Sequence, residues 1–201
     1  MIAAIILAAG ASERMGYPKA LLTYRGRPFL SGILDACAAA AMEPRVVVLG
    51  YYAEKIKQQI DLSDAVVAQS DELDAGPIGS IRAGIRALET HPIDAVLVWP
   101  VDRPHVALDT VSALLDGFRR THREIVVPVW EGRRGHPVLF ARAVFAELLA
   151  APNDEGARAV VRRIRARVTE VRVTDSAVLE DLNTPGDYRE LLRREDRLRG
   201  D

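Results

Sequence analysis

The feature that most constrains this chain is the passage from an apolar run, residues 2–7, directly into a loop of small residues. An apolar run of this length predicts a buried strand, which ends at Gly10. The segment from Leu7 to Lys19 reads LAAGASERMGYPK and holds two cations, Arg14 and Lys19. Small side chains let a bulky ligand approach the backbone, whose N–H groups can point at phosphate oxygens. The loop therefore predicts a triphosphate site.

This loop differs from the two best-known phosphate-binding loops. A P-loop has four residues between its glycines and then a Gly-Lys pair, whereas here five residues separate Gly10 from Gly16 and Tyr17-Pro18 follows. A dinucleotide-binding loop needs a middle glycine and runs on into a helix, which the proline opposes. The spacing argues against a Walker A site and against a Rossmann redox domain.

Length and composition bound the rest of the interpretation. With 201 residues, 49% of them hydrophobic, the chain can bury one substantial core and is short for two domains. A net charge of −1, from 27 basic and 28 acidic residues, predicts no general attraction to nucleic acid or to a membrane surface. One cysteine, Cys37, excludes a disulfide framework. No apolar run approaches the roughly 20 residues that span a bilayer, and a cleavable leader pattern is lacking. We expect one cytoplasmic domain over residues 1–201.

Strand and helix patterns alternate along the chain. Short apolar runs predict buried strands, and apolar residues at helical spacing predict amphipathic helices between them. The predicted strands cover residues 2–7, 45–50, 65–68, 93–98, 125–129 and 168–173, and a further turn enters a strand over 132–140. The predicted helices begin near residues 28, 53, 81, 109, 158 and 185. This alternation predicts an α/β fold with a mainly parallel central sheet, and we expect 168–173 at its edge.

A second glycine-rich segment, residues 74–80, precedes the helix that holds Ile81, Ile85 and Leu88. A helix N-terminus offers free N–H groups and the positive end of a dipole, so Gly79 and Ser80 are candidates to face an anion or a base edge. The same residues also suit an ordinary N-cap. The residues alone leave both interpretations open.

Asp102 closely follows the predicted strand at 93–98. In an open α/β sheet, a residue just past the carboxyl end of a central strand lies in the crevice where ligands bind, which makes Asp102 a candidate metal ligand. An aspartate in a turn before proline is also a common turn-former, and that alternative stays open. His105 follows three residues later, and we expect it at the surface at a helix start, outside the catalytic set.

The last helix has a clear start signal. Thr184 suits the N-cap, Pro185 the first helical position and Asp187 the third, as in a carboxylate variant of the capping box. This local role does not depend on any function.

The first loop resembles the signature of the MobA-like nucleotidyltransferases, LAAGxSxRMGxPK with a Leu-Leu soon after. Every fixed position is present, including Leu21-Leu22. The resemblance implies a three-layer α/β sandwich of the nucleotide-diphospho-sugar transferase or GT-A-like type, which is related to the Rossmann fold. The nucleotide-binding residues that it assigns are Leu7, Ala8, Ala9, Gly10, Ser12, Arg14, Lys19, Gly79 and Ser80.

The resemblance also assigns a metal site. The family places one acid in an Asp-x-Pro motif, matched here by Asp102, and another in an Asp-x-Asp-Thr-Pro-x-Asp segment, where this chain has Asn183. An Asn carbonyl oxygen can still ligate Mg²⁺, which takes one or two protein carboxylates and fills its shell with water and phosphate oxygens. Asp102 and Asn183 are thus the expected Mg²⁺ ligands. Alternatively, Asp181 or Asp187 takes the acid's place, or catalysis has been lost.

Two further segments resemble the family's acceptor side. Gly135 and Pro137 match a Gly-x-Pro-Val element that borders the second substrate, and Arg158 stands in a Gly-Ala-Arg segment. Arg158 otherwise belongs to a charge-rich helix pattern, which is usually a solvated face. Contact of this basic helix with a partner that receives the product, such as a molybdoenzyme or its chaperone, is left open.

The activity implied by the resemblance is transfer of a nucleotidyl group from an NTP to a phosphorylated small molecule, with Arg14, Lys19 and Asp102 as catalytic residues. The family's guanylyltransferase branch carries Gly-Gly at the position of Ala9-Gly10, whereas its molybdenum cofactor cytidylyltransferase branch carries Ala-Gly. We therefore expect transfer of CMP to a molybdopterin-type acceptor. The alternatives are transfer to another phosphorylated molecule such as a sugar phosphate, a nucleotide-binding chaperone or sensor without turnover, and a redox domain.

Overall fold

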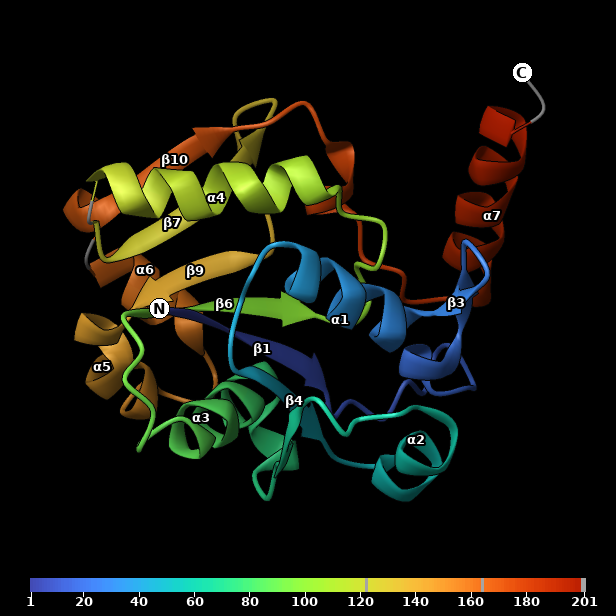
Figure 1. Cartoon of the computed structure of the whole chain (residues 1–201), viewed down its shortest axis with the longest axis horizontal. Coiled ribbons are helices and arrows are strands. Elements are labelled where there is room, and N and C mark those ends of the chain that lie inside the picture. Colours follow the sequence, from blue (N-terminus) through green and yellow to red (C-terminus); the bar gives the residue numbers. More distant parts are fainter. Residues whose placement is uncertain (122, 164, 200–201) are drawn as a thin grey trace.

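The computed structural model describes residues 1–121, 123–163 and 165–199. The strands are β1 (Ile2–Ala8), β2 (Thr23–Tyr24), β3 (Arg27–Pro28), β4 (Arg45–Leu49), β5 (Val66–Gln69), β6 (Ala95–Pro100), β7 (Ile125–Trp130), β8 (Arg133–Arg134), β9 (Val138–Ala141) and β10 (Val168–Arg172). One eight-stranded sheet has the order β10-β7-β9-β6-β1-β4-β5, with β8 paired to β7, while β2 and β3 form a separate ribbon (Figure 1).

Helices cover both faces of the sheet. The α-helices are α1 (Phe29–Ala39), α2 (Ala53–Gln59), α3 (Pro77–Ala87), α4 (Leu108–Thr121), α5 (Phe145–Leu149), α6 (Ala157–Arg163) and α7 (Pro185–Arg199). Short 3-10 turns lie at η1 (Lys19–Leu21), η2 (Leu73–Ala75), η3 (Arg142–Val144), η4 (Arg165–Arg167) and η5 (Ser176–Leu179). No helix in the described ranges is long and apolar enough to cross a membrane.

The alternation of side chains along β1 divides the core into two halves. Ala4 and Ile6 pack with buried residues of α1, α2, α4 and α7, whereas Ala3 and Ile5 pack with those of α3, α5 and α6. Successive residues of a strand face opposite sides of a sheet, so a strand buried on both faces has an unbroken apolar sequence. The result is a three-layer α/β sandwich, and the predicted fold class is confirmed.

Strand direction determines where the loops meet. β1 pairs in parallel with β4 and with β6, but β9 runs antiparallel to β6 and to β7. The register places Val138 at the start of β9 beside Val98 near the end of β6. The loops that leave β1, β4 and β6 and the segment that enters β9 therefore lie at one edge of the sheet, where α/β proteins bind ligands.

One helix boundary differs from the prediction. α3 begins at Pro77, because proline suits a first helical turn and Gly76 takes the left-handed φ of 65° that reverses the chain before it. Gly79 and Ser80 therefore lie inside the first turn rather than in the preceding loop. The helix that starts near residue 158 ends at Arg163, and β10 follows from Val168 as the predicted edge strand.

Candidate functional site

Main-chain hydrogen bonds hold the loop from Ala8 to Lys19. Ser12 takes a left-handed φ of 51°, and its carbonyl oxygen accepts hydrogen bonds from Met15 N and Gly16 N, each at 3.0 Å. Ser12 Oγ accepts a weaker bond from Lys19 N at 3.3 Å, which joins the two ends of the loop. Left-handed geometry at a residue other than glycine costs about 1–3 kcal/mol and persists only where the surroundings enforce it. The loop is therefore held in one shape before any ligand arrives.

The start of this loop lies close to the end of β4. Tyr51 N donates to the Ala9 carbonyl oxygen at 3.3 Å. A Cβ on Gly50 would lie 2.8 Å from the Ala9 Cβ, closer than carbon atoms pack. Only glycine fits at position 50, and the close contact leaves the ends of β1 and β4 without a bulky side chain between them.

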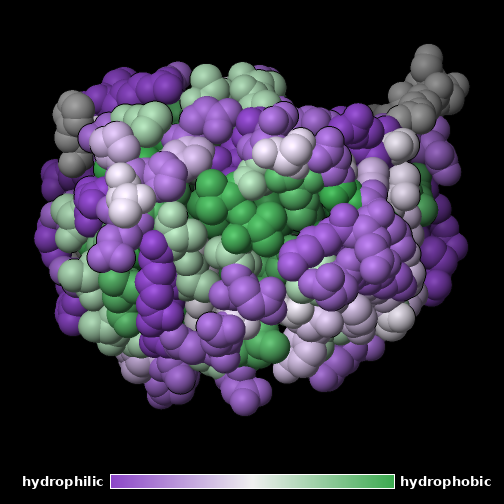
Figure 2. Space-filling view, turned by 60° about the horizontal axis from the view of Figure 1, so that its bottom comes forward, coloured by the Kyte–Doolittle hydropathy of each residue, from purple (hydrophilic) through white to green (hydrophobic). Residues whose placement is uncertain are grey.

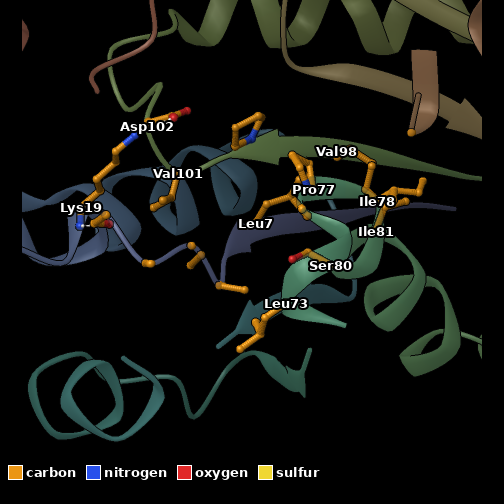
Figure 3. A pocket seen from close by; sticks show the side chains of 18 of the residues that line it. Leu7, Lys19, Leu73, Pro77, Ile78, Ser80, Ile81, Val98, Val101 and Asp102 are labelled. Atoms are coloured by element: carbon orange, nitrogen blue, oxygen red, sulfur yellow. Dashed lines mark hydrogen bonds and ion pairs between the residues drawn. The ribbon is translucent and has the colours of Figure 1, made fainter. Parts of the chain in front are cut away.

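A lysine, an aspartate and an asparagine from three distant segments meet at one end of the site. Lys19 Nζ donates to Asp102 Oδ2 at 3.0 Å and to Asn183 Oδ1 at 2.8 Å. Figure 3 shows the Lys19 and Asp102 side chains directed at one another. A hydrogen bond from Leu182 N to the Asp102 carbonyl oxygen, at 3.2 Å, aligns the two oxygen-bearing segments. The structure thus brings together Lys19, predicted as a cation that binds the triphosphate, and the two predicted metal ligands.

The donor set at this position fits a hard divalent ion. Asp102 Oδ1 is buried and has no hydrogen-bond partner among the described residues, and the Asn183 amide oxygen lies beside the same lysine. No group of three or more His, Cys, Asp or Glu side chains suited to a metal occurs in the described ranges. Mg²⁺ needs only one or two protein oxygens when phosphate oxygens and water complete its shell. The residues present therefore suit an ion that arrives with a phosphate ligand.

The two alternative acids are engaged elsewhere. Asp181 accepts an ion-pair contact from Arg103. Asp187 accepts hydrogen bonds from Thr184 N at 2.8 Å and Asn183 N at 3.0 Å, while Asp187 N donates back to Thr184 Oγ1. The predicted capping box is confirmed. The Thr184 hydrogen bond lowers the pKa of Asp187, and Arg14 adds to the lowering because its charge lies nearby.

These residues line a cavity of about 960 Å³. In the space-filling view, hydrophobic side chains gather in a hollow of the visible face and hydrophilic ones surround it (Figure 2). The volume lies near the top of the usual range for small-molecule sites, about 300–1,000 Å³. The predicted site residues that line it are Leu7, Ala8, Ala9, Gly10, Ser12, Arg14, Lys19, Ser80, Asp102, Arg158 and Asn183.

The cavity has two walls of different construction. We call the segment 8–19 the loop wall, and the segments 135–137 and 151–158, which reach the cavity through His136 and residues 153–158, the arginine wall. An apolar surface lies at the end of the cavity far from Lys19 and Asp102 (Figure 3). It is formed by Ile78, Ile81 and Val98. The cavity thus has a charged cluster at one end and an apolar surface at the other.

Two glycines predicted as ligand contacts pack against protein instead. A Cβ on Gly79 would overlap the Glu72 carbonyl oxygen, and a Cβ on Gly135 would overlap the Val178 carbonyl oxygen. Neither glycine lines the cavity, and Pro137 does not line it either. Close approach to backbone is a common reason for glycine, but here the backbone belongs to the protein rather than to a cavity ligand.

His136, between these two residues, does line the cavity and was missed by the sequence analysis. The ring Nδ1 is buried without a hydrogen-bond partner among the described residues, and the His136 backbone N–H donates to the Val178 carbonyl oxygen at 2.9 Å. Burial lowers the pKa of the imidazole to about 4, with the nearby Arg103 charge adding to the effect. The ring is neutral at ordinary pH, and its position inside the Gly-x-Pro element was the available signal.

Two buried arginines hold the arginine wall in place. The Arg103 guanidinium donates to the Val178 carbonyl oxygen, which also accepts a hydrogen bond from the His136 backbone N–H. Arg82 of α3 donates to Asn153 Oδ1 at 2.9 Å, to the Ala151 carbonyl oxygen, and to Glu72 beside η2. Arginine at a helical position normally predicts a solvated side chain, so the sequence offers no signal for these roles. Arg158, by contrast, is exposed at the cavity rim and forms no ion pair within the described part of the chain.

The expectation of a surface histidine at position 105 is wrong. The His105 side chain is only 5% exposed, its Nε2 lies 3.5 Å from Glu180 Oε2, and its ring meets that of Tyr24 edge to face. Burial lowers the pKa of His105. Arg194 of α7 binds both oxygens of Glu180, at 3.1 and 2.7 Å, and holds the pKa of that carboxyl at about 2. This cluster fastens α7 to the body of the protein, which the one-dimensional pattern does not reveal.

Known proteins resemble this chain over most of its length. Residues 4–169 match the MobA-like NTP transferase domain. The crystal structure of Rv0371c from Mycobacterium tuberculosis H37Rv is 32% identical, with a TM-score of 0.84 over 96% of this chain and 97% of that chain. A structure of that protein in complex with manganese is 30% identical, with a TM-score of 0.80 over 96% and 98% of the two chains.

Two relatives of described activity carry different names. A nicotine blue oxidoreductase from Paenarthrobacter nicotinovorans is 28% identical over 91% of this chain and 92% of its own. A probable molybdenum cofactor guanylyltransferase from Bacillus cereus (strain Q1) is 30% identical over 69% of this chain and 66% of its own.

Proposed function

This chain belongs to the MobA-like NTP transferase family, and on that premise we propose that it transfers CMP from CTP to a phosphorylated acceptor of the molybdopterin type. The observation that carries the proposal is the cluster of Lys19, Asp102 and Asn183 at the end of a preformed small-residue loop. The cavity of about 960 Å³ around it is the space in which we place both the NTP and the acceptor. An NTP whose phosphates follow the loop brings its α-phosphorus to the cluster.

The chemistry needs no protein base. A phosphate oxygen of the acceptor attacks the α-phosphorus of the NTP, a new P–O bond forms, and the bond to the β-phosphate oxygen breaks with release of pyrophosphate. A phosphate dianion is already nucleophilic at neutral pH. The protein therefore contributes position and charge stabilisation, which two cations and an acid supply without a Cys or His nucleophile.

In this proposal Arg14 and Lys19 bind the triphosphate, and Ser80 with Ala8, Ala9 and Gly10 surrounds the nucleoside. Asp102 and Asn183 would hold Mg²⁺, which when bound neutralises charge on the phosphate oxygens. The manganese complex of Rv0371c supports a divalent ion for this family. Asn183 in place of an acid leaves one negative charge at the position instead of two.

The acceptor lies against the arginine wall in this proposal. Arg158 is free to meet an anionic group, and the neutral His136 imidazole offers a hydrogen bond without charge. Gly135 acts behind it in this proposal, since it packs closely on Val178, which accepts the His136 backbone N–H; Pro137 follows outside the cavity lining. A molybdoenzyme or chaperone that receives the product stays a prediction.

The choice of base rests on Ala9, where guanylyltransferases of the family carry glycine. Relatives such as the Bacillus cereus protein are named as guanylyltransferases, so GTP is the competing donor. Pyrophosphate release is measured with CTP, GTP and ATP in turn, each with Mg²⁺ and with or without molybdopterin cofactor. Acceptor-dependent release from CTP above the other two supports the proposal, whereas preferential release from GTP overturns the base assignment.

Variants make the same assay specific for the site. Asp102→Asn removes the acid and is expected to abolish acceptor-dependent release. Asp64→Asn, at an exposed turn outside the cavity, is the matched control and retains wild-type release. If nucleotide binds and no acceptor supports pyrophosphate release, Asn183→Asp is tested next. Absence of release from this variant as well favours a nucleotide-binding protein without turnover.

A second candidate function follows from one comparison. The relative from Paenarthrobacter nicotinovorans, which matches 91% of this chain, is named an oxidoreductase. A redox function predicts tight binding of NADH or NADPH in the same cavity. Titration of the protein with each cofactor, followed by nicotinamide fluorescence, separates the two candidates because the transferase has no use for either cofactor.

A further inference from the structure

We infer that Lys19 is the resident cation of the metal position: its ammonium occupies the place between Asp102 and Asn183 until a nucleotide draws it away and a divalent ion enters. The inference rests on the proposed function, because it requires an NTP as ligand. Its basis is the pair of contacts from Nζ to Asp102 Oδ2 at 3.0 Å and to Asn183 Oδ1 at 2.8 Å. The lysine thus binds both residues that fit a divalent ion.

The charges around the cluster balance without a metal. Asp102 carries one negative charge and Lys19 one positive charge, while the neighbouring Asp181 is paired with Arg103. Asn183 adds an oxygen but no charge. A divalent ion that bound here beside the ammonium would meet an uncompensated positive charge at close range, in a position where the two side chains are only 13% and 22% exposed. The free protein therefore binds such an ion poorly.

Triphosphate binding changes this balance. The Lys19 backbone N–H is held by Ser12 Oγ at the end of the loop wall, but the side chain beyond it is a flexible four-carbon stem. The ammonium can move to phosphate oxygens while the loop keeps its shape. Its departure frees Asp102 Oδ2 and Asn183 Oδ1, and the phosphates supply the further oxygens that a divalent ion requires. Metal and nucleotide binding are then coupled.

Asn183 makes this coupling possible. A carboxylate at position 183 would place two negative charges around one ammonium and leave a net charge to attract a divalent ion without nucleotide. The amide keeps the nucleotide-free cluster neutral. The departure from an acid at this position is, on this inference, what makes metal entry depend on substrate.

The test is Mn²⁺ binding to the full chain, measured from the free-ion EPR signal. Each protein is titrated alone and with a CTP analogue whose α,β-bridge is a methylene group, and Mn²⁺ bound by the analogue itself is subtracted. Wild type is expected to bind Mn²⁺ weakly alone and at least about tenfold more tightly with the analogue. Lys19→Met is expected to tighten nucleotide-free binding by about tenfold, because it removes the competing charge.

Lys57→Met is the matched control, since Lys57 forms an exposed pair with Glu54 on α2 and should leave Mn²⁺ affinity unchanged. Asn183→Asp is the second variant, which keeps Lys19 and should also tighten nucleotide-free binding. Equal nucleotide-free affinity in wild type and both variants overturns the inference. If wild type still releases pyrophosphate, the proposed function survives that result; absence of both release and analogue-dependent Mn²⁺ binding overturns the two together.

Discussion

The two walls of the cavity are held by different parts of the chain. Main-chain hydrogen bonds around Ser12 fix the loop wall, whereas the buried guanidinium groups of Arg82 and Arg103 fix the arginine wall. In the loop wall, a side chain can change without loss of the shape of the backbone. In the arginine wall, loss of a side chain removes the support itself. In the loop wall, different groups contact the ligand and hold the backbone in place. In the arginine wall, side chains do both.

The largest effect on the reaction rate is expected from Lys19, the loop-wall cation that is proposed to bind the transferred phosphate. Lys19→Met should lower the rate of pyrophosphate release about 10²–10³-fold, the scale of one lost electrostatic contact in a transition state. Thermal unfolding should change little, because the loop backbone is held without this side chain. Initial rates and circular dichroism melts measure the two quantities, with Lys57→Met as the control. A rate within a factor of three of wild type would contradict the role of Lys19.

The next effect concerns the support of the arginine wall. Arg82→Met removes charged hydrogen bonds to Glu72, Asn153 and Ala151 and should lower the free energy of unfolding by about 2–3 kcal/mol. Arg86→Met is the matched control, because Arg86 reaches the same Glu72 from a side chain that is 59% exposed and should cost less than about 1 kcal/mol. Urea denaturation measures both. Equal costs would show that Arg82 does not support the wall.

The sequence predicts the loop wall better than it predicts the arginine wall. The loop wall is one continuous segment, so its spacing alone indicated a triphosphate site, and the carboxyl ends of parallel strands indicated that Asp102 lies near it. The arginine wall is assembled from residues far apart in the chain. Arg82 and Arg103 have the sequence appearance of solvated side chains, and only the tertiary fold shows what surrounds them.

Glycines show the limit of the sequence particularly well. Gly79 was expected at the ligand because it lies near a helix N-terminus, and Gly135 because it matches a family segment that borders the second substrate, but each one approaches a carbonyl oxygen of the protein. A pattern indicates that something lies close to a glycine without indicating what. The prediction of an exposed His105 is wrong for a related reason. A polar residue near a helix start does not indicate which distant residues cover it, here Tyr24 and Glu180.

These two glycines offer a paired test, because each packs against a carbonyl oxygen of the protein and neither lines the cavity. Gly79→Ala and Gly135→Ala should each destabilise the protein by about 1–3 kcal/mol, because the added Cβ overlaps backbone that cannot move freely. Each should raise the KM of one substrate only, the NTP for position 79 and the acceptor for position 135. Gly32→Ala in α1, where a Cβ meets open space, is the control and should not destabilise. Denaturation curves and two-substrate kinetics provide the measurements.

The smallest effect is expected at His136. His136→Phe keeps the size of the ring and removes the hydrogen-bonding nitrogens, so the KM for the acceptor should rise by up to about tenfold, the worth of one hydrogen bond. The KM for the NTP should not change. Because burial holds the pKa of His136 at about 4, acceptor KM attributable to this residue should be flat between about pH 6 and pH 8. A change in the KM of the NTP would contradict the assignment of His136 to the acceptor side of the cavity.

The reversed direction of β9 has a consequence for how such a site changes over evolution. His136 reaches the cavity from the segment that connects β7 to β9, while the loop wall is reached as the chain leaves β1. A hairpin tip tolerates insertion and exchange, whereas the exit of a central parallel strand does not. New acceptor chemistry can therefore be acquired by rewriting a hairpin while the nucleotide loop is inherited intact. Relatives with names as different as guanylyltransferase and oxidoreductase can share one scaffold on this basis.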